Sequence, residues 1–157
     1  MKELEYPFNG DYILKKKKKI RRELLEADRQ WLHKRIAVLG GSTTSDVIKI
    51  LDLFLLNQGI QAEFYESEYG MFWEDAVFGN EELDKFHPDL IYVHTTNRNI
   101  KEYPVITSTK EEVDTLLEQE YQYFVQVWEN LASRYHCPVI QLSLIHISEP
   151  TRHSLIS

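Results

Sequence analysis

A short apolar strand that ends in two glycines and a run of hydroxyl residues constrains the fold of this chain more than any other feature. The segment from Arg35 to Asp46 reads R-I-A-V-L-G-G-S-T-T-S-D. The uninterrupted apolar block 36–39 is typical of a strand buried on both faces of a parallel sheet. Gly40 and Gly41 allow a positive φ or the close approach of another backbone, and a following Ser or Thr can cap a helix. The segment therefore predicts a strand, a tight turn and the start of a helix.

The turn itself is a candidate site. Backbone amides at the start of a helix favour an anion or an oxyanion, so Gly40, Gly41, Ser42 and Thr43 are candidate ligand-binding residues. Two interpretations of Ser42 stay open at this point. Its hydroxyl is either the N-cap of the following helix or a nucleophile, because Gly-Gly-Ser turns also occur in α/β domains where they do no chemistry.

Helix and strand patterns alternate along the rest of the chain. Apolar spacing predicts helices over 15–30, 46–58 and 109–134, and strands over 60–66, 90–94 and 138–141. We expect helix 46–58 to be buried on most of its circumference, and helix 109–134 to carry an apolar stripe along its length: Val113, Leu116, Leu117, Tyr121, Phe124, Val125, Trp128 and Leu131. The alternation predicts a three-layer, doubly wound parallel α/β sheet.

Polar side chains follow the predicted strands, where ligands bind in open α/β sheets. Glu66 ends the second strand and His94 the third, with Arg98 just beyond it. His94 is either a base or a hydrogen-bonded structural residue, and Arg98 either binds a carboxylate or phosphate or forms a surface ion pair. The aromatic cluster between the second and third strands is either a lid over the crevice or a packed loop: Tyr69, Phe72, Trp73 and Phe78.

Composition excludes several classes of function. The net charge of -7 argues against a nucleic-acid-binding protein. No apolar run approaches the roughly 18 residues of a spanning helix, so no membrane association is expected. The single cysteine, Cys137, cannot form an internal disulfide, which fits a cytoplasmic protein. The histidines are scattered, and no metal site is expected. The basic run 15–19 is either a solvated helix face or a contact for a phosphate or a carrier protein.

The last residues are expected to have a different origin from the rest of the sequence. Residues 142–152 read L-S-L-I-H-I-S-E-P-T-R, which matches the conceptual translation of a transposon adaptor used in DNA library preparation. We therefore expect the protein's own sequence to end near Gln141 and exclude 142–157 from fold reasoning. The remaining chain divides into an N-terminal helical segment, 1–33, and an α/β domain, 34–141, which is expected to be incomplete at its C-terminus.

Several motifs in order resemble one family. The segments L-G-G-S-T-T, L-F-L-L-N-Q-G-I, F-Y-E-S-E-Y and H-T-T-N-R-N-I are together similar to the N-terminal domain of FkbH-like proteins, which belong to subfamily IIIC of the haloacid-dehalogenase (HAD) superfamily. The resemblance runs from Tyr12 to about Gln141. It implies an SGNH-hydrolase-like (flavodoxin-like) domain, followed in the family by a HAD domain that uses Mg²⁺ and a D-x-D-x-T motif. This sequence contains no D-x-D-x-T.

The resemblance also implies roles for two residues. Ser42 takes the place of the SGNH nucleophile, although the usual Gly-Asp-Ser is replaced by Gly40, Gly41 and Ser42. Asn97 corresponds to the oxyanion-hole asparagine, with the Ser42 amide as second donor, or else caps a turn. A serine needs a positioned base, and in SGNH enzymes that histidine lies near the end of the domain, which this chain lacks. We therefore expect no ester turnover by this chain.

The function implied by the resemblance concerns a longer enzyme. FkbH-like proteins form or transfer an activated three-carbon glyceryl unit onto an acyl carrier protein, and this domain would supply the half that binds the acyl group, a small phosphorylated substrate or the carrier. No cofactor is expected in this half. The alternative is a non-catalytic module on the same scaffold that binds a carrier protein or a ligand.

Overall fold

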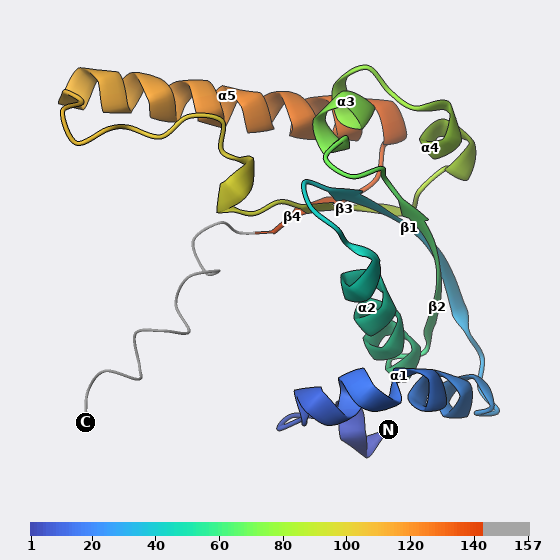
Figure 1. The fold of residues 1–157 in the computed structure, drawn as a ribbon. Helices are drawn as coiled ribbons and strands as arrows, with labels where there is room; N and C mark the ends of the chain where they lie inside the picture. Colours follow the sequence, from blue (N-terminus) through green and yellow to red (C-terminus); the bar gives the residue numbers. More distant parts are fainter. Residues whose placement is uncertain (143–157) are drawn as a thin grey trace, which may run out of the picture.

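The four strands of the computed structural model form one parallel sheet, and the structure describes residues 1–142 (Figure 1). The strands are β1 (Leu32–Gly40), β2 (Ile60–Glu66), β3 (Leu90–His94) and β4 (Val139–Gln141). Their order across the sheet is β2-β1-β3-β4. Helices cover both faces, which confirms the doubly wound three-layer α/β fold. The adaptor-like tail beyond Leu142 lies outside the described residues.

The apolar block of β1 lies at the centre of the sheet. Ile36 is paired with Phe64 of β2 on one side and with Leu90 of β3 on the other. Residues 36–39 are at most 6% exposed, which confirms burial on both faces. β1 begins four residues before this block because the exposed residues 32–35 extend the ladder with β2 alone.

One face of the sheet is covered by α2 (Ser45–Asn57), and η1 (Lys2–Leu4) and α1 (Gly10–Leu25) pack against α2 (Figure 1). These elements share an apolar core: Leu4, Ile13, Ile20, Leu24, Leu53 and Leu56. The predicted bounds of α1, 15–30, are wrong at both ends. The helix begins earlier because the side chain of Asn9 caps it by accepting from the Tyr12 amide at 3.0 Å, and it ends at Leu25, where the chain turns into β1. Within α2, Leu53 and Leu56 are fully buried, and Asp52 is 7% exposed.

The other face is covered by α3 (Phe72–Val77), α4 (Glu81–Phe86) and α5 (Lys110–Tyr135). Their core packs on Ala37, Leu39, Ile91 and Val93 of the sheet, and its helical members are Phe72, Ala76, Leu83, Phe124, Val127 and Leu131. The aromatic cluster predicted as a lid or a packed loop is divided. Phe72 belongs to this core, whereas Tyr69 and Phe78 are 75% and 72% exposed.

The first half of α5 extends beyond the sheet (Figure 1). A helix of 26 residues is about 39 Å long, whereas the strands beneath it are short. Phe124, Val127 and Leu131 are buried, but Leu117 and Tyr121 are 65% and 56% exposed. The predicted apolar stripe is therefore buried only in the C-terminal half of the helix.

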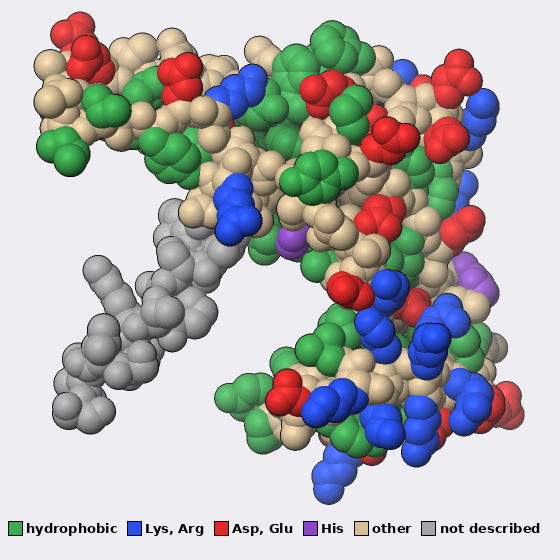
Figure 2. Space-filling view, viewed as in Figure 1, with side chains coloured by type: hydrophobic (Ala, Val, Ile, Leu, Met, Phe, Trp, Pro, Cys, Tyr) green, Lys and Arg blue, Asp and Glu red, His purple; other side chains and the backbone are tan. Residues whose placement is uncertain are grey.

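Charge is unevenly distributed over the surface. Figure 2 shows Lys and Arg side chains gathered over α1, at the end of the molecule where the N-terminus lies. Lys15, Lys16 and Lys18 of the basic run are exposed, whereas Lys17 pairs with Asp46 at 3.1 Å. Within residues 1–142, no helix has the length and apolar character needed to cross a bilayer.

Candidate functional site

The turn after β1 is fixed by the strands on either side of it. The Gly40 amide donates to Ser67 Oγ beyond β2 at 2.9 Å, and the Gly41 amide donates to the His94 carbonyl of β3 at 2.9 Å. Parallel strands end at the same edge of the sheet, so three segments distant in sequence meet at this turn.

Both glycines are required by close packing. A Cβ on Gly40 would lie 2.7 Å from the Ser42 carbonyl oxygen, and a Cβ on Gly41 would overlap the Asn99 side chain. Neither glycine is among the residues with a positive φ. Of the two reasons for glycine that the sequence offered, close approach is therefore the one that applies.

The hydroxyl residues of the turn have separate roles. The N-cap of α2 is Thr44, which is 1% exposed and whose Oγ1 donates to Glu66 Oε1 at 2.7 Å. Ser42 lies three residues before the helix and is half-buried, so it is not the N-cap. Within residues 1–142, the Ser42 side chain makes no hydrogen bond. Thr43 is exposed.

Asn99 is the asparagine that lies on the turn. Its Nδ2 donates to the Gly41 carbonyl at 2.9 Å, and its Oδ1 accepts from the Thr96 amide at 2.9 Å. Asn97, to which the resemblance gave the oxyanion role, is exposed at the start of η2 (Asn97–Asn99), and its carbonyl accepts from the Tyr103 hydroxyl. Sequence reasoning missed Asn99, although the spacing of Thr96 and Asn99 signals the capping box that the structure contains.

His94 is held by its own strand. Side chains two residues apart on a strand share a face, and Tyr92 Oη lies 3.1 Å from His94 Nδ1. Burial lowers the pKa of His94, so the neutral imidazole is favoured at neutral pH. Among the described residues, no hydrogen bond joins His94 to Ser42.

The charged groups around the turn differ in how they are paired. Glu66 is engaged by Thr44, and Asp46 is paired with Lys17 and with Lys49, which lower its pKa. Arg98 is exposed at η2, and the part of the chain that the structure describes gives it no ion pair. Carboxylates committed in this way do not form a set of oxygen ligands for Mg²⁺, and no trio of His, Cys, Asp or Glu side chains within residues 1–142 is placed to hold a metal ion.

The arrangement offers a hydroxyl group and a helix N-terminus to an oxygen-rich group. The turn places the Ser42 hydroxyl, which has no hydrogen-bond partner within residues 1–142, before the N-terminus of a 13-residue helix, and such a terminus favours negative charge. A serine nucleophile requires a base within hydrogen-bond reach, and no such partner of Ser42 is found among the described residues.

Fold and site together define an α/β protein with a candidate ligand site at the carboxyl edge of a doubly wound parallel sheet. No family model and no curated protein matches the sequence. The fold is similar to the crystal structure of the N-terminal part of the protein BF1531 from Bacteroides fragilis, which contains a phosphatase domain and was solved in complex with Mg. The TM-score is 0.63 at 15% identity, over 88% of this chain and 35% of that chain. The chain thus spans about a third of that structure, and the likeness concerns the fold.

Proposed function

We propose that this chain is the N-terminal, SGNH-hydrolase-like part of an FkbH-like protein of HAD subfamily IIIC. It supplies the half of that enzyme that binds an acyl or phosphorylated three-carbon unit, or the acyl carrier protein that bears it. Two observations support the proposal: the ordered motifs around Ser42 and His94, and a fold shared with the N-terminal part of a protein that has a phosphatase domain. Magnesium belongs to the phosphatase-type half of the longer protein, and the proposed location is the cytoplasm.

The observation that most supports binding without hydrolysis is that the Ser42 hydroxyl has no hydrogen-bond partner within residues 1–142. Ser42 is half-buried beside two glycine amides that are already used, and it has no hydrogen-bonded base among residues 1–142. A phosphate or carbonyl oxygen of the ligand can accept from this hydroxyl near the start of α2. The chain alone therefore binds its ligand and does not hydrolyse an ester.

The basic face of α1 supports a carrier protein as partner. Lys15, Lys16 and Lys18 are exposed on a chain that is otherwise acidic, and the neighbouring Lys17 contacts Asp46 in the first turn of α2. A surface of this kind attracts an acidic protein and steers its approach toward the turn.

Two measurements on the purified chain test this assignment. Hydrolysis of p-nitrophenyl acetate is compared for the wild type, Ser42→Ala and the matched control Thr43→Ala, and we expect equal background rates for all three. Calorimetric titration with a phosphopantetheine-bearing acyl carrier protein is expected to show binding that Lys15→Glu and Lys16→Glu weaken, while Lys85→Glu on α4 leaves it unchanged. Hydrolysis that depends on Ser42, or binding that is insensitive to α1, contradicts the proposal.

A second candidate is a module that binds without any part in catalysis, and the absence of a hydrogen-bonded base for Ser42 among the described residues favours it. Ser42→Ala in the longer FkbH-like enzyme separates the two candidates. Unchanged acyl transfer with intact folding supports the module, whereas lost turnover shows that Ser42 takes part in the reaction once the whole enzyme surrounds it.

A further inference from the structure

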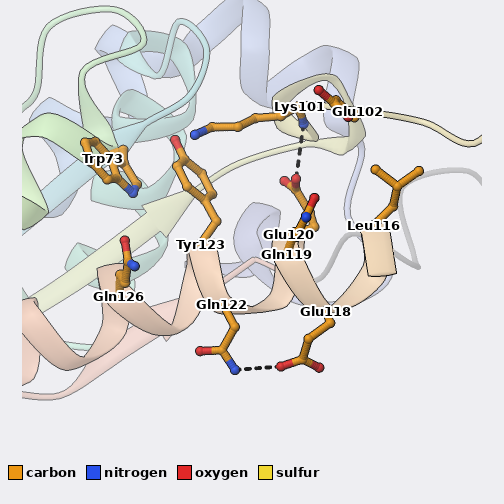
Figure 3. A pocket seen from close by; sticks show the side chains of 10 residues that line it. All are labelled: Trp73, Lys101, Glu102, Leu116, Glu118, Gln119, Glu120, Gln122, Tyr123 and Gln126. Carbon is orange, nitrogen blue, oxygen red and sulfur yellow. Dashed lines mark hydrogen bonds between the residues drawn. The ribbon is translucent and has the colours of Figure 1, made fainter. Parts of the chain in front are cut away.

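A pocket lies away from the turn, between α3, the segment after η2 and the middle of α5 (Figure 3). Its volume is about 460 Å³, within the range of small-molecule sites. One end of it is formed by Trp73 of α3, by Lys101 from the segment after η2, and by Tyr123 of α5. None of the candidate residues at the carboxyl edge of the sheet lines this pocket.

Two aromatic rings of the pocket hold an ammonium group. The rings of Trp73 and Tyr123 are parallel within 4°, with centroids 5.5 Å apart. Lys101 reaches over them, with its Nζ 3.8 Å from the Tyr123 centroid and 5.5 Å from that of Trp73. Both distances lie within the range of cation–π attraction. The chain thus fills an ammonium position with its own lysine.

Two polar atoms of the pocket are buried and unpaired. Trp73 Nε1 and Glu120 Oε1 are inaccessible to solvent and have no hydrogen-bond partner among residues 1–142. The other carboxylate oxygen of Glu120 accepts from the Lys101 amide at 3.3 Å. A buried polar atom without a partner is costly, so the pocket lacks an acceptor for the indole N–H and a donor for the carboxylate.

The charges of the lining favour a cation. Among the described residues that line the pocket, three are carboxylates, Glu102, Glu118 and Glu120, and one, Lys101, is positively charged. Burial raises the pKa of Tyr123 to about 12, with smaller contributions from the carboxylates of Glu74 and Glu120. An anionic ligand would be repelled here, and an ammonium would be attracted.

We propose that this pocket binds a small organic ammonium that bears a hydroxyl group, the class of amino alcohols and amino sugars. The ligand's ammonium replaces Lys101 over the Tyr123 ring and donates to Glu120 Oε1. Glu120 and Tyr123 are three residues apart on α5, so their side chains are neighbours on one helix face. The ligand's hydroxyl oxygen accepts from Trp73 Nε1, and Lys101 moves out to solvent.

Nuclear magnetic resonance of the full chain tests this directly, since the indole N–H of Trp73 is a reporter inside the pocket. Trp73→Phe assigns its signal among those of the three tryptophans. D-glucosamine is the probe, and D-glucose, which lacks the ammonium, is the matched ligand control. We expect glucosamine to shift the Trp73 signal saturably and glucose to leave it in place at the same concentrations.

Three variants with thermal unfolding like that of the wild type refine the test. Lys101→Met removes the internal competitor and is expected to tighten glucosamine binding by about threefold or more. Glu120→Gln is expected to weaken binding by about tenfold. Glu118→Gln removes the same charge from the same helix, but Glu118 already accepts from Gln122 at 2.8 Å, so a smaller effect is expected.

Three results would each contradict a different part of the proposed ammonium site. Equal shifts with glucose and glucosamine would exclude the ammonium as the recognised group. No saturable shift in either the wild type or Lys101→Met would show that the two rings only anchor Lys101. Equal effects of Glu118→Gln and Glu120→Gln would show that Glu120 acts only through its charge, and would overturn the proposed contact between its carboxylate and the ligand's ammonium.

Discussion

Asn99 connects the two loops that meet at the candidate site. Its amide nitrogen donates to the Gly41 carbonyl, and its amide oxygen accepts from the Thr96 backbone, so one side chain fixes both the turn and the cap of η2. Asn97, two residues earlier, is exposed and makes no comparable side-chain contact within residues 1–142. The two asparagines therefore form a natural matched pair.

We expect Asn99→Ala to lower the free energy of unfolding by about 1–3 kcal/mol, because it leaves half-buried backbone groups of both loops without partners. Asn97→Ala is expected to change it by no more than about 0.5 kcal/mol. Urea unfolding of both variants measures the difference. Equal losses would show that the Asn99 bridge does not stabilise the turn.

His94 makes stability depend on pH. Burial holds its folded-state pKa below the ordinary value of 6.5, so below about pH 6.5 the unfolded chain binds more protons than the folded one. Stability is therefore lost as the pH falls from 6.5 toward the folded-state pKa, and it is retained above this window. Urea unfolding at about pH 7.5 and about pH 5.5 is expected to show a larger loss for the wild type than for His94→Asn. The same loss in both would assign the effect to other groups.

The turn shows what sequence reasoning reached at the scale of single residues. Gly40, Gly41, Glu66 and His94 were predicted to lie at one edge of the sheet, because parallel strands end there. The structure has three separate hydrogen bonds at this edge, from Gly40 to Ser67, from Gly41 to the His94 carbonyl and from Thr44 to Glu66. The choice between Asn97 and Asn99 depends on how the η2 turn is oriented in space, which their spacing in the sequence does not determine.

At the scale of elements, α4 is attached to the end of α5 by a hydrogen-bonded ion pair. Asp84 accepts from Arg134 Nε at 2.9 Å and Nη2 at 2.8 Å, and from the Tyr135 hydroxyl at 2.7 Å. These donors lower the pKa of Asp84. The Arg134 guanidinium also lies against Gly79, where the lack of a side chain leaves room for it. Gly79 has a φ of +84°, a backbone conformation that also favours glycine.

We expect Arg134→Lys to loosen α4, because lysine keeps the charge but loses the two-pronged geometry. The change in global stability is expected to stay below about 1 kcal/mol, since both partners are partly exposed, while amide hydrogen exchange in Glu81–Phe86 becomes faster. Lys85→Gln, which removes an exposed pair with Glu81 at 3.2 Å, is the control. Unchanged exchange in Arg134→Lys would exclude this role.

The elements that sequence predicted best are those with a strong local signal. β2 and β3 have the predicted bounds: β2 follows Gly59, and β3 is a mostly apolar segment that follows Pro88 and Asp89. α3 and α4 were not predicted. Each has six residues, which is too few to show a repeated helical pattern of apolar residues. Each also depends on distant contacts, such as the burial of Phe72 and Leu83 in the core below α5.

At the scale of the whole molecule, the protein has two apolar cores, and only the second includes residues of the sheet. One joins η1, α1 and α2, and the other joins α3, α4 and α5. Cys137, the single cysteine, packs against the second core at the junction of α5 and β4, and burial raises the pKa of its thiol.

Because of this position, the reactivity of the Cys137 thiol reports on opening of the protein on the α5 side of the sheet. A disulfide reagent reacts with an exposed thiolate, and Cys137 is half-buried, so its labelling rate is expected to rise when the α5 layer opens more often. Leu83→Ala and Leu53→Ala each remove a fully buried leucine, from the second and the first core respectively, at a cost of about 2–5 kcal/mol. We expect Leu83→Ala to accelerate labelling more than Leu53→Ala at the same loss of global stability. Equal acceleration would instead mean that the two layers open only together, as a single cooperative unit.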